Sequence, residues 1–479
     1  MVRSGHLIFP LLGLATATCK LPINTPAAFK ERCRNLPAFL RIPNSNATSA
    51  EFVPAGTTLL FPNAVPSCGR TSQIVTIDLC RVTAEVATSA QSGIKMETWL
   101  PLNWSGRFLS TGNGGLGGCI QYEDIQYAAS LGFATVGTNN GHDGGDGSTF
   151  TQLEVVEDYA YRALHTGVVL GKQVSRTFYG RPHTKSYYLG CSTGGRQGFK
   201  EAQSFPDDFD GIVAGAPAFS FNSLTVWPLI AKDILKQCDH LDVAVDGILE
   251  SPDLGNYDPS GLLCAEGQNS STCLTQTQAD TVRSIYSPLR DVEGSFVYPG
   301  MQPGGESTEA AFAMFNGRPF GASDWWKYAI FNDSSWDPLT LKKEGFTVAS
   351  QLNLFNIDTW EGDLSAFQRK GGKLLHYHGL VDGIITSANS PRYYEHVSQT
   401  MRLSPFELDK FYRFFRVSGM AHCFGGPGAS NIGNGGFTPP ASLKPEENVF
   451  MAMVQWVEKG IAPGGPGDVK DENSWACVQ

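Results

Sequence analysis

The chain has 479 residues and a formal net charge of −10, with 36 Lys and Arg against 46 Asp and Glu. Hydrophobic residues make up 41% and charged residues 17%, which suits a large packed core and excludes intrinsic disorder, a coiled coil and a collagen-like fibre. A net negative chain without a run of Lys and Arg also excludes nucleic acid and an anionic membrane surface as expected partners.

The N-terminus is typical of a secreted protein. Arg3 precedes an apolar run over 7–15, and the small residues Ala15 and Ala17 form a pattern that signal peptidase recognises, so we expect a signal peptide at 1–17. The run is too short to span a bilayer, so no membrane contact is expected after cleavage. The 11 Cys indicate disulfides and an extracellular location. Four N-glycosylation sequons agree, at Asn46, Asn103, Asn269 and Asn332.

In chain order, strand-type and helix-type patterns alternate. Strands are expected first at 73–81, 94–100, 107–110 and 133–138. A helix over 153–174, a strand at 185–189, a helix from Ser192 through 203 and a strand at 211–214 follow. The alternation resumes with a strand at 373–378, a helix at 387–402, a strand at 411–417 and a helix at 445–459. This order predicts a mostly parallel sheet of the α/β class.

The alternation is interrupted by a stretch rich in Pro, Gly, Asp, Cys and aromatic residues. We expect a catalytic α/β domain made of 18–217 and 371–479, with a lid domain inserted at 218–370. Such a lid would cover the carboxyl ends of the strands, where open α/β sheets bind ligands.

A nucleophile motif lies at the junction of a predicted strand and helix. The sequence Gly190-Cys191-Ser192-Thr193-Gly194 matches G-x-S-x-G, the strained turn that exposes a catalytic serine. The Thr193 N–H would lie at the helix N-terminus and suits an oxyanion hole. A second donor is expected from Gly114 or Gly115 in a glycine-rich loop after an earlier strand. The alternatives are a chance match to the motif and a merely flexible glycine loop.

A serine nucleophile needs a general base and an acid that orients the base. Asp382 follows the predicted strand at 373–378, and His422 follows the one at 411–417. This gives the order Ser, Asp, His of the α/β hydrolases. Among the other histidines, His376 and His378 are expected to be buried and structural. His142 and His183 stay unassigned near loops.

Two cysteines flank the proposed nucleophile and base. Cys191 precedes Ser192, and Cys423 follows His422. If Ser192 and His422 are hydrogen-bonded, their neighbours lie within the Cα separation that a disulfide requires. Such a bridge would tether the base to the nucleophile. The alternative is a pair of buried free thiols.

These motifs, with GCSTGGRQG at 190–198 and SFPDDFDGIVAGAPA at 204–218, resemble the fungal and bacterial tannase and feruloyl esterase family. The resemblance runs from about residue 33 to residue 459. It implies an α/β-hydrolase core with a lid, and Ser192, Asp382 and His422 as the triad. It also implies the bridge Cys191–Cys423 and three others: Cys33–Cys80, Cys68–Cys119 and Cys264–Cys273. Cys19, Cys238 and Cys477 are left without assigned partners.

Acidic residues cluster within the expected lid. Asp239, Asp242 and Asp246 repel one another unless a cation binds them, so the residues alone indicate either a calcium site or a solvated acidic turn. The resemblance implies a structural Ca²⁺, held by these three side chains and by the carbonyls of Ala244 and Ile248. No organic cofactor is expected.

The resemblance implies a secreted serine carboxylic ester hydrolase whose partner is a phenolic-acid ester. We expect a feruloyl esterase that releases ferulic, p-coumaric and caffeic acids from plant cell-wall polysaccharides such as xylan, through an acyl-enzyme. The alternative is a tannase that hydrolyses galloyl esters. From another class, an inactive hydrolase-fold binding module would have lost a triad residue, and all three are present. The preferred phenolic acid and the oligomeric state stay open.

The expected lid also carries aromatic residues that would suit a wall against a phenolic ring. Taken singly, each of them is more often a core residue than a binding surface. The group is Phe219, Phe221, Trp227, Phe320, Trp325, Trp326, Tyr328 and Trp336.

Overall fold

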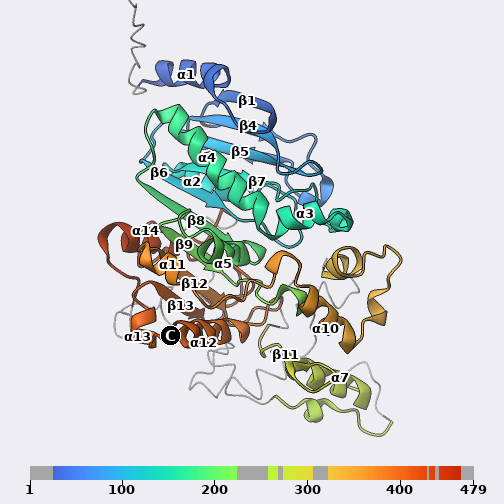
Figure 1. Cartoon of the computed structure of the whole chain (residues 1–479). Helices are drawn as coiled ribbons and strands as arrows, with labels where there is room; N and C mark the ends of the chain where they lie inside the picture. Colours follow the sequence, from blue (N-terminus) through green and yellow to red (C-terminus); the bar gives the residue numbers. More distant parts are fainter. Residues whose placement is uncertain are drawn as a thin grey trace, which may run out of the picture.

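The computed structural model describes residues 25–223, 257–267, 273–305, 322–428, 431–436 and 442–464 (Figure 1). Several sequence predictions lie outside these residues: the signal peptide 1–17, the calcium ligands Asp239, Asp242, Ala244, Asp246 and Ile248, the sequon at Asn269, the aromatic residues Trp227 and Phe320, and the cysteines Cys19, Cys238 and Cys477.

A nine-stranded sheet in the order β1-β4-β5-β7-β6-β8-β9-β12-β13 forms the centre of the molecule. Three strands at one side pair antiparallel: β1 (Ser45–Val53), β4 (Leu79–Ala87) and β5 (Gly93–Pro101). The other six run parallel to one another: β7 (Ala134–Thr138), β6 (Arg107–Thr111), β8 (Lys185–Cys191), β9 (Gly211–Gly215), β12 (Lys373–Gly379) and β13 (Tyr412–Val417). The predicted mostly parallel sheet is confirmed.

The strand predicted at 73–81 is wrong in its extent. Strand β3 (Ser72–Ile74) ends early and pairs with β2 (Thr58–Leu60) in a separate small sheet, whereas β4 begins only at Leu79. Between them, the Asp78 carboxylate accepts the backbone N–H of Ala55 at 2.8 Å. One apolar run therefore supplies two strands with different partners.

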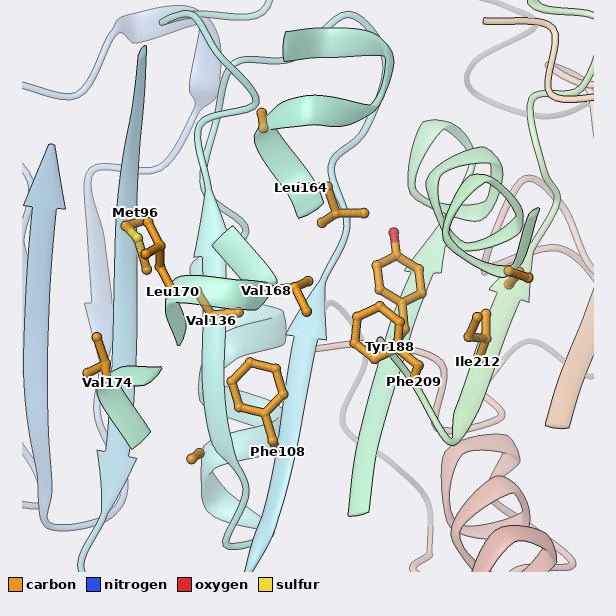
Figure 2. Close-up of a cluster of buried hydrophobic side chains, with 14 of the residues drawn as sticks. Met96, Phe108, Val136, Leu164, Val168, Leu170, Val174, Tyr188, Phe209 and Ile212 are labelled. Carbon is orange, nitrogen blue, oxygen red and sulfur yellow. The ribbon is translucent and has the colours of Figure 1, made fainter. Parts of the chain in front are cut away.

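Helices cover both faces of the sheet because the pleat sends alternate side chains to opposite sides. On one face lie α1 (Pro26–Phe39), α4 (Ala163–Tyr179), α5 (Thr193–Ser204), α11 (Ser365–Arg369) and α12 (Asn389–Met401). On the other lie α2 (Tyr122–Ser130) and α14 (Val449–Lys459). In β8, Tyr188 packs into the first core and Tyr187 and Leu189 into the second. Figure 2 shows Leu164 and Val168 of α4 in the first core.

The helix predicted over 153–174 is a continuous helical segment with an irregular turn. It begins with α3 (Leu153–Glu157), passes through a π-helical segment at Asp158–Arg162 and continues as α4. The carbonyls of Tyr159 and Ala160, in this π-helical segment, accept hydrogen bonds from the guanidinium of Arg196 at 3.3 and 2.9 Å. These two carbonyls stabilise the charge of Arg196, a fully buried residue in the first turn of α5.

In the described residues, the chain between β9 and β12 adds no strand to the large sheet. It forms α7 (Gln276–Tyr286), β10 (Leu289–Arg290), β11 (Phe296–Tyr298), α9 (Ala322–Asp324), a π-helical segment (Trp325–Ile330), α10 (Lys343–Leu352) and short 3₁₀ turns at Phe221–Ser223, Pro259–Leu262, Pro338–Thr340 and Leu354–Asn356. Elements α7, β11 and α10 lie together at one side of the sheet (Figure 1). That 218–370 forms a lid domain stays a prediction.

Aromatic residues of this segment pack inward. Phe221 and Trp325 contact one another and the ring of Tyr159, with ring centroids 5.2 to 6.3 Å apart. Phe219 and Trp326 are also buried. These four expected ring-binding residues are therefore core side chains in this structure.

Four disulfides join the described residues: Cys33–Cys80, Cys68–Cys119, Cys191–Cys423 and Cys264–Cys273. These are the four pairings expected from the sequence and the resemblance. No helix among the described residues is both long enough and apolar enough to cross a membrane.

Candidate active site

Ser192 occupies a strained turn between β8 and α5. Its backbone has φ 63° and ψ −123°, a region that residues with a side chain rarely adopt. A Cβ atom on Gly195 would lie 2.2 Å from the carbonyl oxygen of Gly215, and one on Gly194 would lie 3.0 Å from that of Asn113. Glycines at these two positions let the first turn of α5 pack closely against the neighbouring backbone, so the helix begins directly after the half-buried serine.

The acid and the histidine meet where β12 and β13 end. The Nδ1 atom of His422 lies 2.7 Å from Oδ2 of Asp382. Because a carboxylate only accepts, Nδ1 carries a proton, and Nε2 is the ring nitrogen that can take up the proton of a nucleophile.

Asp382 is fully buried, and its environment keeps it ionised. Burial raises the pKa of this carboxyl, but the charge of His422 and the hydrogen bonds from His378 and His422 outweigh burial and hold the pKa well below its usual range. The other oxygen, Oδ1, accepts the backbone N–H groups of Ile384 and Ile385 at 2.8 and 2.9 Å.

The disulfide between Cys191 and Cys423 brings the serine and histidine turns together. It joins Cα atoms 5.9 Å apart across 232 residues of sequence. Strands β8 and β13 are not neighbours, because β9 and β12 lie between them. Ser192, Asp382 and His422 thus lie at the ends of three parallel strands, on the same edge of the sheet. Their catalytic roles stay a prediction.

The glycine-rich loop predicted to complete an oxyanion hole lies against the start of α5. The Thr193 hydroxyl donates to the carbonyl of Gly115 at 2.7 Å. Within the described part of the chain, the backbone N–H groups of Gly114, Gly115 and Thr193 donate to no protein acceptor. They are therefore free to bind a developing negative charge, as the prediction requires.

A buried amide network that sequence reasoning missed fixes this loop. The Gln197 side chain on α5 accepts the backbone N–H of Asn113 at 3.0 Å. It donates to the side-chain oxygens of Asn113 and Asn140 at 3.2 and 3.0 Å. All three residues are buried. The only sequence signal for Gln197 was its place in the run GCSTGGRQG.

The unassigned histidines divide between the two ends of the sheet. Burial lowers the pKa of His142, so the ring is neutral, and its Nε2–H donates to the carbonyl of Leu116 in the glycine-rich loop at 2.8 Å. His183 lies two residues before β8, against the ring of Phe108 at the opposite end of the strand from Ser192. His142 therefore supports the site, and His183 is remote from it.

His376 and His378 are both fully buried, as expected for structural residues. The sequence did not predict that His378 contacts the acid, with Nε2 at 3.1 Å from Oδ2 of Asp382.

Among the described residues, one group of potential metal ligands has its atoms within 4.8 Å of one another: His165, Glu201 and Asp208. The Asp208 carboxylate is already paired with His165 at 2.7 Å and with the ammonium of Lys172 at 3.5 Å. Burial and the Asp208 charge hold the pKa of Glu201 well above its usual range, so this carboxyl is neutral. The group fits an internal ion pair better than a cation site.

The mixed sheet, the serine turn after β8, the acid after β12 and the histidine after β13 define the α/β-hydrolase fold. The sequence model of the family described as "Tannase and feruloyl esterase" matches residues 80–230 and 225–477. The chain belongs to the tannase and feruloyl esterase family.

Individual relatives agree. A Neosartorya fischeri protein named "Probable feruloyl esterase B-2" is 47% identical over 527 aligned residues, which cover 98% of this chain and 99% of the relative. The crystal structure of feruloyl esterase B from Aspergillus oryzae is 47% identical with a TM-score of 0.87, over 94% of this chain and 100% of that one. Tannin acyl hydrolase from Aspergillus niger shares the fold, at 23% identity and a TM-score of 0.70, over 91% and 88% of the two chains.

We predict that Gln197→Met lowers kcat more than it affects KM. The near-isosteric thioether leaves the Asn113 N–H and two amide oxygens unpaired, at about 1–3 kcal/mol for each buried group, and releases the glycine-rich loop. Steady-state kinetics on a phenolic methyl ester and a melting curve measure both effects. Gln173→Met on α4, whose amide contacts only a surface carbonyl, is the control. Equal kinetics in the two variants would contradict the role given to the network.

Proposed function

We propose that this carboxylic ester hydrolase is a feruloyl esterase, with Ser192 as nucleophile, His422 as general base and Asp382 as the orienting acid. The observation that carries the proposal is the 2.7 Å contact between His422 Nδ1 and buried Asp382, held beside the serine turn by the Cys191–Cys423 bond. Relatives named feruloyl esterase B at 47% identity, against 23% for the tannin acyl hydrolase, favour hydroxycinnamoyl esters over galloyl esters.

In the proposed reaction, Nε2 of His422 removes the proton of the Ser192 hydroxyl while Oγ attacks the ester carbonyl carbon. The negative charge that develops on the carbonyl oxygen is stabilised by the N–H of Thr193 and by one from Gly114 or Gly115. His422 then gives its proton to the departing alcohol, and the acyl group stays on Ser192. Water, activated by the same histidine, releases the phenolic acid. Asp382 remains a carboxylate throughout.

We also propose that the protein is secreted, with cleavage after residue 17. Four disulfides among the described residues support an oxidising compartment. Two of the sequon asparagines, Asn103 and Asn332, have exposed side chains that a glycan could reach. The sequon at Asn46 lies in the edge strand β1.

Replacing the nucleophile tests the triad. Ser192→Ala should lower kcat by at least about 10⁴-fold on methyl ferulate and methyl gallate alike, because removal of a nucleophilic hydroxyl leaves only binding and the oxyanion hole. Ser204→Ala, at the exposed end of α5, is the matched control and should retain wild-type rates. Substantial hydrolysis by the Ser192 variant would refute the assignment.

A panel of methyl esters tests the acyl specificity. We expect kcat/KM for methyl ferulate, p-coumarate or caffeate to exceed that for methyl gallate by at least about tenfold, roughly 1.4 kcal/mol of transition-state binding. Methyl sinapate, with a second methoxy group, reports the room around the ring. A preference for gallate over every hydroxycinnamate would make the enzyme a tannase.

We propose further that Ca²⁺ binds at 239–248 as a structural ion. Chelation should then lower the melting temperature by about 3–8 °C, and added Ca²⁺ should restore it, because a ligand that binds only the folded state stabilises that state. Asp239→Asn/Asp242→Asn is expected to melt at the same temperature with and without Ca²⁺. Unchanged melting after chelation, with no metal found by elemental analysis, would exclude this site.

A further inference from the structure

A series of hydrogen-bonded buried side chains leads away from the acid through His378. His378 Nδ1 lies 2.6 Å from the hydroxyl of Ser390, and His376 Nε2 lies 2.9 Å from the same hydroxyl. His376 Nδ1 lies 2.9 Å from the hydroxyl of Tyr412. These four side chains and Asp382 are all fully buried.

The direction of the bond to the acid follows from the groups that His378 faces. Its Nε2 lies 3.1 Å from Asp382 Oδ2 and 3.1 Å from the carbonyl oxygen of Ile385. Both oxygens are acceptors only, so Nε2 carries a proton whatever the state of Nδ1. Asp382 Oδ2 therefore accepts two imidazole N–H groups, one from His422 and one from His378.

If the His378 ring is neutral, the donor and acceptor of every other hydrogen bond in this series of side chains are fixed. Nδ1 of His378 then accepts the Ser390 proton, and the Ser390 oxygen accepts the Nε2–H of His376. The remaining nitrogen of His376 accepts the hydroxyl proton of Tyr412. Burial holds the pKa of His376 well below and that of Tyr412 well above their usual values, so both are neutral across the working pH range.

These hydrogen-bonded side chains come from three elements near the acid: β12, α12 and β13. His376 and His378 lie on the same face of β12, two residues apart, as strand alternation requires. Ser390 lies in the first turn of α12, and Tyr412 begins β13. Since His378 is fully buried, it does not reach a substrate and acts only through Asp382.

The inserted segment covers the same acid from another side. Gln302 donates to the backbone carbonyl of Asp382 at 2.8 Å and accepts from the hydroxyl of Thr386 and the N–H of Ser387. Tyr298 of β11, whose pKa burial raises, is a neutral phenol there. The ionisable groups that act on Asp382 are thus His422, His378 and this phenol, and the charge of Arg392 offsets part of the rise in the phenol's pKa.

We infer that His378 is a positioning residue for the proposed triad: its Nε2–H holds Asp382 Oδ2 toward His422 and takes up part of the charge on that oxygen. Ser390 and His376 in turn fix the ring of His378. This inference rests on the proposed function, since it assigns His378 a role toward the catalytic acid.

The pH dependence of kcat/KM distinguishes this role from simple packing. Without the His378 donor, Oδ2 is more basic and stabilises the imidazolium of His422, so the base stays protonated up to a higher pH. In His378→Leu the acid limb should therefore move up by about half to one pH unit, with kcat about 10- to 100-fold lower. In His378→Gln an amide N–H replaces Nε2–H, and the limb should lie closer to wild type.

The experiment compares wild type, His378→Leu, His378→Gln and Ser390→Ala on methyl ferulate from pH 4 to 9. Titration with a serine-reactive phosphonate counts active sites, and melting curves record stability. Ser390→Ala keeps the imidazole but removes its fixing hydroxyl, so it should shift the limb in the same direction by less. If His378→Leu does not fold, the pH profile of Ser390→Ala decides the test. A shifted limb in the Leu variant that Gln reverses, at similar melting temperatures, supports the inference.

Two results overturn the inference. One is an unmoved acid limb in both His378→Leu and Ser390→Ala; the other is equal limbs in the Leu and Gln variants, with losses that follow melting temperature alone. Failure of the triad itself has a separate signature, because Ser192→Ala would then remain active. An inactive Ser192→Ala enzyme with wild-type pH profiles in the His378 variants refutes only the role of His378.

Discussion

The geometry of the site depends on bringing Ser192 and His422 together, although the strands that carry them are not neighbours in the sheet. β8 and β13 are three strand spacings apart, which is roughly 14 Å. Cys191 is the last residue of β8 and Cys423 lies in the turn after β13, yet their Cα atoms are only 5.9 Å apart. Both Ser192 and Cys423 have positive φ values, 63° and 67°, which residues with a side chain rarely adopt. The disulfide fixes this unfavourable backbone in the folded protein.

Burial of the acid imposes the second constraint. A carboxylate in a dry interior is costly unless its lone pairs are satisfied. Asp382 has two backbone donors on one oxygen and two imidazole donors on the other. Its backbone carbonyl is bound by Gln302, which belongs to the chain between β9 and β12. The acid therefore depends at once on the core sheet and on the segment inserted into it.

The sequence was most informative where chemistry and periodicity coincide. The runs at 185–189, 211–214 and 373–378 lie within the observed strands, and the G-x-S-x-G motif lies at a strand–helix turn as expected. The run at 73–81 was predicted as one strand because its hydrophobicity does not reveal that it contains parts of two strands with different partners. Polar contacts were less accessible still: Gln197 and Asn113 are 84 residues apart, and nothing local to either shows that they meet.

The π-helical segment at Asp158–Arg162 adds a constraint on how this sequence can change. A π-helical turn accommodates one residue more than an α-helical turn over the same rise. Deleting a single residue there would restore a regular helix, rotate the carbonyls of Tyr159 and Ala160 by about 100°, and leave the buried guanidinium of Arg196 without its acceptors. The π-helical segment and the buried Arg196 of α5 are therefore structurally coupled.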